Sequence, residues 1–170
     1  MLNGKELVEN GIIFGNIEEE NIAQHGVDLN LIKIERIVGA GIIPYKGKTQ
    51  LPKYEQIKPR LVPFESLEDE VLSWHLQPGT YSVTFQQGCR IPNNQMLLIR
   101  QRSSLLRCGT FLHSSVFDAG FETQNIGTVI VVTLPITIQY NARIAQIYNH
   151  ECTAVENLYN GQFQNDKQRK

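Results

Sequence analysis

The stretch GTVIVVTLPITIQYNARIAQIYNH, residues 127–150, indicates the fold class of this chain. Its three pieces GTVIVVTL, ITIQY and ARIAQIYNH are rich in branched and aromatic side chains, which fit a pleated sheet better than a helix. Turn-forming residues separate the pieces. The stretch therefore predicts three short strands in succession.

The same pattern continues towards the N-terminus. QMLLIRQ and GTFLHSS, within residues 95–115, have a similar β-forming composition. In LQPGTYSVTF a Pro-Gly turn precedes Tyr81, Val83 and Phe85, whose spacing places them on one face of a strand. From Val27 onward, VDLNLIKIERI alternates apolar and polar residues, which is typical of a half-buried strand.

A short helix is expected only at the N-terminus, where Asn3 can cap it and Gly11 can end it. Many short strands after one small helix predict a mostly β sandwich or jelly roll, in one domain over residues 1–170. Residues 39–66 contain four prolines, and we expect them to cross the surface without regular structure. The polar tail, residues 159–170, is expected to be mobile on its own.

Composition restricts the possible functions. With 41% hydrophobic and 19% charged residues the chain is expected to be globular. A net charge of -1 gives no overall attraction for nucleic acid or membranes, so a bound anion must be held by a local cluster. The absence of a long apolar run or a signal-peptide core predicts a cytoplasmic protein. The cysteines and histidines show no zinc-site spacing.

Arg102, Ser103 and Ser104 follow the predicted strand QMLLIRQ. A turn there presents a guanidinium, two hydroxyls and successive backbone N–H groups, a combination that suits phosphate oxygens. A helical turn over LLRCG would add the attraction of its N-terminus. The alternative is an ordinary capped surface turn.

Asp118 lies in SSVFDAGFE, where Ala119-Gly120 marks a tight turn. A carboxylate beside a phosphate site can accept a proton from a water that attacks phosphorus. The alternative is an aspartate that bonds its own turn backbone. Phe121 can stack on a sugar or base, or belong to the core.

Two further polar residues have open roles. Gln146, in ARIAQIY, can donate to a phosphate or satisfy a neighbouring backbone group. Asp28 stands at the start of a predicted strand and by itself indicates no function.

Taken in order, HGVDL, RSSLLRCG, FDAGF, ARIAQ and the C-terminal YNGQFQ resemble the motifs of the dUTPase and dCTP deaminase superfamily. The resemblance covers nearly the whole chain, and RSSL and RIAQ at this spacing are its most specific parts. It implies a homotrimer of distorted jelly-roll subunits with active sites at the subunit interfaces. It also implies a magnesium-bound deoxynucleoside triphosphate as ligand.

The resemblance assigns a role to each phosphate-side residue. Arg102, Ser103 and Ser104 match the phosphate-binding motif, and Gln146 matches a second phosphate contact. Arg107 matches an arginine typical of the deaminase branch and joins them as a phosphate-binding candidate. Asp28 then matches an acidic residue of the first motif.

The resemblance also implies which residues activate water, which contact the sugar and the base, and which part of the chain covers the nucleotide. Asp118 matches the aspartate that activates water in dUTPases, and Phe121 takes the place of the tyrosine that packs against deoxyribose. Backbone groups from Leu112 to Val116 would read the base, with Ser114, Ser115 and Val116 as sugar or base contacts. The tail matches a segment that folds over bound nucleotide, with Tyr159, Gln162, Gln164 and Lys167 as candidate contacts.

Two departures from the deaminase pattern bear on the reaction. Where deaminases carry a proton-shuttling glutamate, alignment on Gly127 places Val132, and no acidic residue occurs between Glu122 and Glu151. Valine cannot shuttle protons to a ring. The segment from His113 to Asp118 is also shorter than in relatives, while FETQNIG is longer.

These features predict a dUTP diphosphatase that forms dUMP and pyrophosphate, with Asp118 activating the water. Mg²⁺ is expected as cofactor, held mainly by the triphosphate rather than by protein ligands. A dCTP deaminase, or a bifunctional dCTP deaminase and dUTPase, is the nearest alternative. A nucleotide-binding regulator and a purely structural jelly-roll protein are the others.

Overall fold

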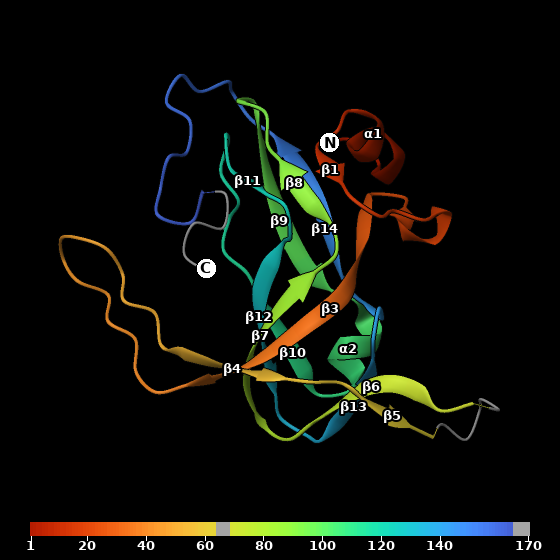
Figure 1. Cartoon of the computed structure of the whole chain (residues 1–170). Helices are drawn as coiled ribbons and strands as arrows, with labels where there is room; N and C mark the ends of the chain where they lie inside the picture. Colours follow the sequence, from red (N-terminus) through yellow and green to blue (C-terminus); the bar gives the residue numbers. More distant parts are fainter. Residues whose placement is uncertain (64–68, 165–170) are drawn as a thin grey trace.

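The computed structural model describes residues 1–63 and 69–164, and this part of the chain consists mainly of strands (Figure 1). In chain order the elements are α1 (Gly4–Glu9), β1 (Ile13–Phe14), the 3-10 helix η1 (Glu19–Asn21), β2 (Ile22–Ala23), β3 (Gly26–Val38), β4 (Lys53–Ile57), β5 (Arg60–Val62), β6 (Val71–Leu76), β7 (Gly79–Phe85), β8 (Gly88–Arg90), β9 (Gln95–Gln101), α2 (Ser103–Arg107), β10 (Thr110–His113), β11 (Glu122–Thr123), β12 (Gly127–Val132), β13 (Ile136–Gln139) and β14 (Arg143–Glu151).

One large sheet forms the body of the molecule. Its strands follow the order β10-β12-β7-β3-β14-β9, with β2 and β4 also paired to β3. α2 connects the two end strands, β9 and β10, so the sheet curls round on itself (Figure 1). Two small sheets, β1-β8-β11 and β13-β6-β5, lie at its two ends. The predicted jelly-roll-like β fold with a short N-terminal helix is confirmed.

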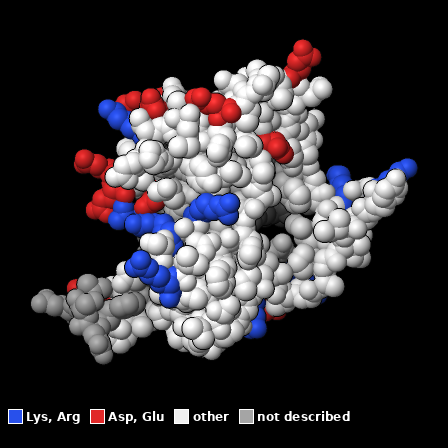
Figure 2. Space-filling model, turned by 180° about the vertical axis from the view of Figure 1, so that it is seen from behind, with Lys and Arg blue, Asp and Glu red and all other residues white. Residues whose placement is uncertain are grey.

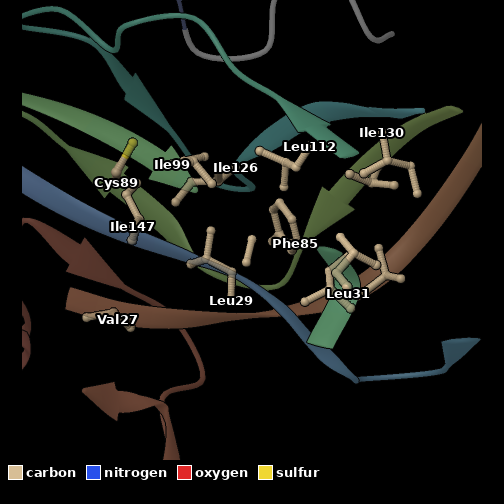
Figure 3. Packing of buried hydrophobic residues seen from close by; sticks show 14 of the residues in the cluster. Val27, Leu29, Leu31, Phe85, Cys89, Ile99, Leu112, Ile126, Ile130 and Ile147 are labelled. Carbon is tan, nitrogen blue, oxygen red and sulfur yellow. The ribbon is translucent and has the colours of Figure 1, made fainter. Parts of the chain in front are cut away.

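The core lies inside this curled sheet. Figure 3 shows Leu29 and Leu31 of β3 meeting Phe85 of β7 and Ile130 of β12, and all four side chains are fully buried. Burying an apolar side chain of this size contributes about 1.5–3 kcal/mol. The strands QMLLIRQ, GTFLHSS, GTVIVVTL, ITIQY and ARIAQIYNH predicted from composition are all present, with their ends shifted by a few residues.

The N-terminal helix begins and ends where the sequence predicts. Asn3 accepts a hydrogen bond from the Glu6 backbone N–H, and the Glu6 carboxylate accepts one from Asn3 N–H. This reciprocal pair satisfies two donors that the helix itself leaves free. Gly11 then adopts a φ of +66°, a conformation that glycine reaches without strain.

The first half of β3 differs from the half-buried strand that alternation predicts. Its polar residues Asp28 and Asn30 are only 5% and 8% exposed. The polar face is covered by the N-terminal segment, from which the Asn21 side chain donates to Asn30 Oδ1. The Gln87 side chain donates to the same oxygen. In this half of β3 the alternation of apolar and polar residues therefore corresponds to two buried faces, one apolar and one polar.

Residues 39–66 are less irregular than expected. Lys53–Ile57 form β4 on β3, and Arg60–Val62 form β5 on β6, while residues 64–66 lie outside the described part. The remainder, residues 39–52, is a long hairpin that we call the arm, with Ile42 and Gln50 bonded to each other. Figure 2 shows the arm standing out from the body with basic side chains at its outer end. In the described part of the chain, no helix is long and apolar enough to cross a membrane.

Candidate active site

The phosphate-side candidates lie together at the junction between β9 and α2, where Arg102 contacts Asp28 and Asp28 contacts Gln146. Arg102 Nε lies 3.2 Å from Asp28 Oδ2, and Gln146 Nε2 donates to Asp28 Oδ1 at 3.1 Å. Gln146 stands opposite Asp28 in the β14–β3 pair, which explains the contact. The Arg102 backbone N–H donates to Ile144 O at 2.9 Å and its guanidinium to Arg143 O at 3.2 Å. Residues from β3 and β14, which are far from Arg102 in the sequence, thus hold its half-exposed guanidinium in place.

The serines of the RSS motif lie on α2, which begins at Ser103 and so starts two residues before the helical turn expected over LLRCG. Ser103 and Ser104 are exposed in its first turn, directly after Arg102. Leu105 is buried and anchors the turn, while Arg107 is exposed in the last turn. Arg102 lies at the N-cap of this helix, so a basic side chain stands at each end of the turn that carries the serines. The turn thus presents hydroxyls and positive charge together.

Asp118 begins the predicted tight turn. Phe121 N–H donates to Asp118 O at 3.0 Å, and Gly120 has a φ of +85°, which fits a type II turn. The Asp118 side chain is exposed. Within residues 1–63 and 69–164, no hydrogen bond or ion pair engages its carboxylate, whereas both oxygens of Asp28 are occupied. Of the two aspartates, Asp118 is the one free to accept a proton.

Asp118 lines a cavity of about 910 Å³. Ser115, Val116, Phe121 and Gly127 line it with Asp118, and Tyr159 lies across from Phe121 with ring centroids 5.5 Å apart. Ser114 is exposed and donates to Ser115 O, and the structure does not place it in the lining.

Sequence reasoning missed part of the cavity wall. The ion pair of Lys33 with Glu35, at 2.8 Å, contributes from β3. Leu51, Pro52 and Tyr54 contribute from the arm and β4. Since β4 pairs with β3 over a long loop, only the three-dimensional structure brings these residues to the cavity.

The structure does not bring the two halves of the predicted site together within one chain. Phe117, next to Asp118, pairs with Leu97 near the start of β9, whereas Arg102 follows the end of β9. The five residue-to-residue steps from Leu97 to Arg102 span about 17 Å of extended chain. Of the described residues that line the cavity, none is Asp28, Arg102 or Gln146.

The start of the C-terminal tail packs against the Asp118 turn. We call residues 152–164 the tail segment, and Figure 1 shows it in blue on the same side as the arm. Tyr159 N–H donates to Ala119 O at 2.8 Å. The amides of Gln162 and Gln164 bond backbone groups of this chain, and Lys167 lies outside the described residues. A direct contact of these glutamines with nucleotide stays a prediction.

One ion pair flanks the turn. Arg90 Nη2 donates to Glu122 Oε1 at 2.8 Å, and this hydrogen bond lowers the pKa of the Glu122 carboxyl below its ordinary value. At neutral pH Glu122 is therefore a charged carboxylate held by Arg90.

Comparison with known proteins identifies the family. The dCTP deaminase-like family model matches residues 4–152. The chain belongs to the dCTP deaminase-like family. The resemblance inferred from the sequence motifs is thereby confirmed.

Proteins similar to this chain include two that are named for hydrolysis of deoxyuridine triphosphate. The deoxyuridine 5'-triphosphate nucleotidohydrolase of Methanocaldococcus jannaschii is 41% identical over 149 residues, which cover 87% of this chain and 90% of that protein. A probable deoxyuridine 5'-triphosphate nucleotidohydrolase of Methanosarcina mazei is 33% identical over 151 residues, covering 87% and 83%.

A solved structure supports the fold. The 2'-deoxycytidine 5'-triphosphate deaminase from Agrobacterium tumefaciens superposes with a TM-score of 0.62 at 15% identity. The match covers 85% of this chain and 45% of that one, so this chain spans less than half of the deaminase. At this identity the similarity concerns the fold alone.

In this dCTP deaminase-like chain, Val132 lies in the core and is 2% exposed. It stands opposite Thr110 of β10 and Gly79 of β7. Thr110 is fully buried, and its hydroxyl has no hydrogen-bond partner in the described part of the chain. Neither valine nor a buried hydroxyl without a relay supplies a proton shuttle of the kind deamination needs.

Proposed function

We propose that the protein is a dUTP diphosphatase that hydrolyses dUTP to dUMP and pyrophosphate. The observation that carries the proposal is the unengaged carboxylate of Asp118 at a cavity large enough for a nucleoside. The names of the relatives from Methanocaldococcus jannaschii and Methanosarcina mazei, both deoxyuridine 5'-triphosphate nucleotidohydrolases, support the choice of substrate.

Arg102, Ser103, Ser104 and Gln146 hold the phosphate chain, and Arg107 adds charge. Asp28 orients the Arg102 guanidinium through Nε, and Nη1 donates to Arg143 O, which leaves the N–H groups of Nη2 for phosphate oxygens. Gln146 gives one amide N–H to Asp28 and keeps the second for a phosphate. Asp28 is thus a positioning residue.

Asp118 accepts a proton from a water molecule as the water oxygen attacks the α-phosphorus in line. The new P–O bond forms as the bond to the bridging oxygen of pyrophosphate breaks, and the electron pair leaves with pyrophosphate. Catalysis rests on orientation and charge stabilisation, with no covalent enzyme intermediate.

Mg²⁺ fits the site as a partner of the substrate. Among the described residues, no three His, Cys, Asp or Glu side chains gather as metal ligands, and both Asp28 oxygens are engaged. The triphosphate oxygens would therefore hold the ion. Bound there, the ion neutralises charge on the phosphates.

Phe121 packs against the deoxyribose and crowds the 2′ position, and Tyr159 covers the nucleoside from the tail. Ser114, Ser115 and Val116, with the backbone from Leu112, read the base. Backbone donors and acceptors arranged to pair with uracil would remain unpaired if cytosine were bound. The cost of these unpaired groups would strongly favour dUTP over dCTP.

A complete site requires a second copy of the chain. The separation of about 17 Å along β9 keeps Arg102 of one copy away from its own Asp118. Closed rings are a common way to bury such shared sites. A homotrimer, in which the phosphate-binding residues of one copy face the Asp118 turn of another, supplies the arrangement.

A bifunctional enzyme that also deaminates dCTP is the second candidate, favoured by the family match over residues 4–152. The buried position of Val132 speaks against it. The test supplies dUTP, dCTP, dTTP and UTP separately with Mg²⁺ and resolves the products by ion-exchange chromatography. We expect dUMP from dUTP alone. Formation of dUTP or dUMP from dCTP would establish deamination, and binding of dUTP without turnover would indicate a regulator.

A further inference from the structure

We propose that Gln101 is a positioning residue for base recognition, which holds the backbone of residues 114–116, the base loop, in the arrangement that selects uracil over cytosine. The inference rests on the proposed function in taking this loop as the contact to the base. Gln101 is the last residue of β9 and directly precedes Arg102. The end of one strand therefore serves the phosphate chain through Arg102 and the base through the Gln101 side chain.

The chain is anchored to β9 on both sides of the base loop. Before the loop, the Leu112 N–H donates to Gln101 Oε1 at 3.1 Å. After the loop, Phe117 and Leu97 exchange two backbone hydrogen bonds, both at 3.0 Å. The second anchor consists of backbone groups, whereas the first depends on the identity of one side chain. A substitution at Gln101 therefore releases one end of the loop alone.

The two anchors leave slack in the chain between them. On β9, four residue-to-residue steps separate Leu97 from Gln101, whereas five steps separate Leu112 from Phe117. An extra residue on one strand of an antiparallel pair bends that strand out of the ladder. Residues 113–116 are accordingly all exposed, while Leu112 and Phe117 are buried. The base loop thus bulges from the sheet between two fixed points.

The base loop has backbone groups to offer a ligand. In the part of the chain that the structure describes, no hydrogen bond engages the N–H groups of Ser114, Ser115 and Val116. His113 O, directly before them, accepts from the Thr128 hydroxyl and is fixed from β12. Uracil presents an N–H between two carbonyl oxygens, whereas cytosine presents an unprotonated ring nitrogen beside an amino group. Groups that distinguish these patterns must be held within about 0.5 Å of the right position.

Gln101 is suited to hold the loop because its own backbone belongs to the sheet. It pairs with Ala145 of β14, which is fully buried. β10, which leads into the base loop, lies at the end of the strand order of the large sheet. The Gln101 amide oxygen provides the acceptor that a further strand would provide. Without this oxygen the N–H of the buried Leu112 would lose its partner, and the chain would shift to bring it to water.

The contact predicts an effect confined to the base. dUTP and dCTP carry the same sugar and the same triphosphate. A change in folding stability, or in the charge beside Arg102, therefore alters the binding of both nucleotides alike. The ratio of their dissociation constants isolates the contact to the base.

Hydrogen exchange of the Leu112 amide tests the contact without nucleotide. In Gln101→Met we expect exchange about tenfold faster than in the unmodified protein, because the acceptor is lost while the side-chain length is kept. Gln101→Glu keeps an oxygen acceptor and should stay within about twofold. Gln95→Met, the matched control, removes an acceptor for Asn149 at the other end of β9 and should leave Leu112 exchange unchanged. Equal exchange in Gln101→Met and the unmodified protein would overturn the contact.

Calorimetric titration with α,β-imido analogues of dUTP and dCTP, which resist cleavage at that bond, tests recognition. With Mg²⁺, the unmodified protein should bind the dUTP analogue at least about 100-fold more tightly. Gln101→Met should lower this ratio about tenfold. Gln101→Glu should keep the ratio within about threefold, although its added charge weakens the binding of both analogues. Gln95→Met should leave the ratio unchanged. An undiminished ratio in Gln101→Met would overturn the positioning role.

Failure of the proposed function gives a different result. If the unmodified protein bound the dUTP analogue no more tightly than the dCTP analogue, uracil would not be the preferred base. The role of Gln101 in selecting uracil would then fall as well. The exchange of the Leu112 amide would still decide whether Gln101 holds the chain that leads into the base loop.

Discussion

Arg102 Nε lies 3.2 Å from Oδ2 of Asp28, a carboxylate that is only 5% exposed and that also accepts from Gln146. The pair joins the first part of the chain to the turn that follows β9. It fixes the direction of a guanidinium that, being 38% exposed, can still reach a ligand. In the proposed mechanism Asp28 acts through Arg102 rather than on the reacting atoms.

Asp28→Asn should raise KM for dUTP roughly tenfold, with a smaller change in kcat, because Arg102 loses a charged partner. Steady-state kinetics checks this. Glu20→Gln is the matched control, since Glu20 pairs with the neighbouring Arg143 at 3.1 Å but is 74% exposed. Its KM should stay within about twofold. A loss of kcat alone in Asp28→Asn would instead place Asp28 in the chemical step.

Asp118→Asn should lower kcat by about 100-fold or more while dUTP still binds, as expected when a general base is removed. Single-turnover measurements with excess enzyme check the chemical step directly. Glu122→Gln removes a nearby carboxylate that is already paired with Arg90 and should change kcat by no more than about threefold. Near-normal turnover in Asp118→Asn would mean that another group takes the proton from the attacking water.

Mixing two inactive variants tests the shared site. Arg102→Ala and Asp118→Asn chains are mixed in equal amounts, unfolded and refolded together. Random assembly then gives about a quarter of the shared sites an intact Arg102 from one chain and an intact Asp118 from the other. The mixture should therefore recover about a quarter of the activity of the unmodified protein. Each variant refolded alone supplies the background. Activity no higher than the mean of the two backgrounds would place the whole site within one chain.

Thr110→Val should stabilise the protein by about 1 kcal/mol, since it removes a buried hydroxyl that has no partner in the described part of the chain. Thr128→Val, on the paired strand β12, should destabilise by a similar amount because the Thr128 hydroxyl donates to His113 O. Urea denaturation measures both. A loss of stability in Thr110→Val would show that its hydroxyl is satisfied in the folded protein.

Local chemistry explains which elements the sequence predicts. The cap at Asn3, the glycine at position 11 and the branched residues of β9, β12 and β14 act within a few residues, and these elements appear where expected. β4 was missed because KYEQI is almost wholly exposed and has no apolar period. Its strand conformation comes from the edge of β3, a partner that composition does not reveal.

In the candidate site, too, some features follow from local sequence and others depend on contacts between distant parts of the chain. The turn after Asp118 follows from Ala119-Gly120, and the helical turn expected beside the RSS motif is present as α2, although it begins at Ser103 within the motif. The contact of Asp28 with Arg102 and the distance between Arg102 and Asp118 depend on which strands are neighbours. The packed tail segment depends on two glutamine side chains that meet distant backbone groups. No local pattern encodes those pairings.

Hydrolysis of dUTP in ¹⁸O-labelled water tests the central claim most directly. If Asp118 directs water at the α-phosphorus, mass spectrometry should find one ¹⁸O atom in dUMP and none in pyrophosphate, at the rate of substrate loss. Label in pyrophosphate would mean that water attacks the β-phosphorus and would contradict the account, as would the absence of dUMP.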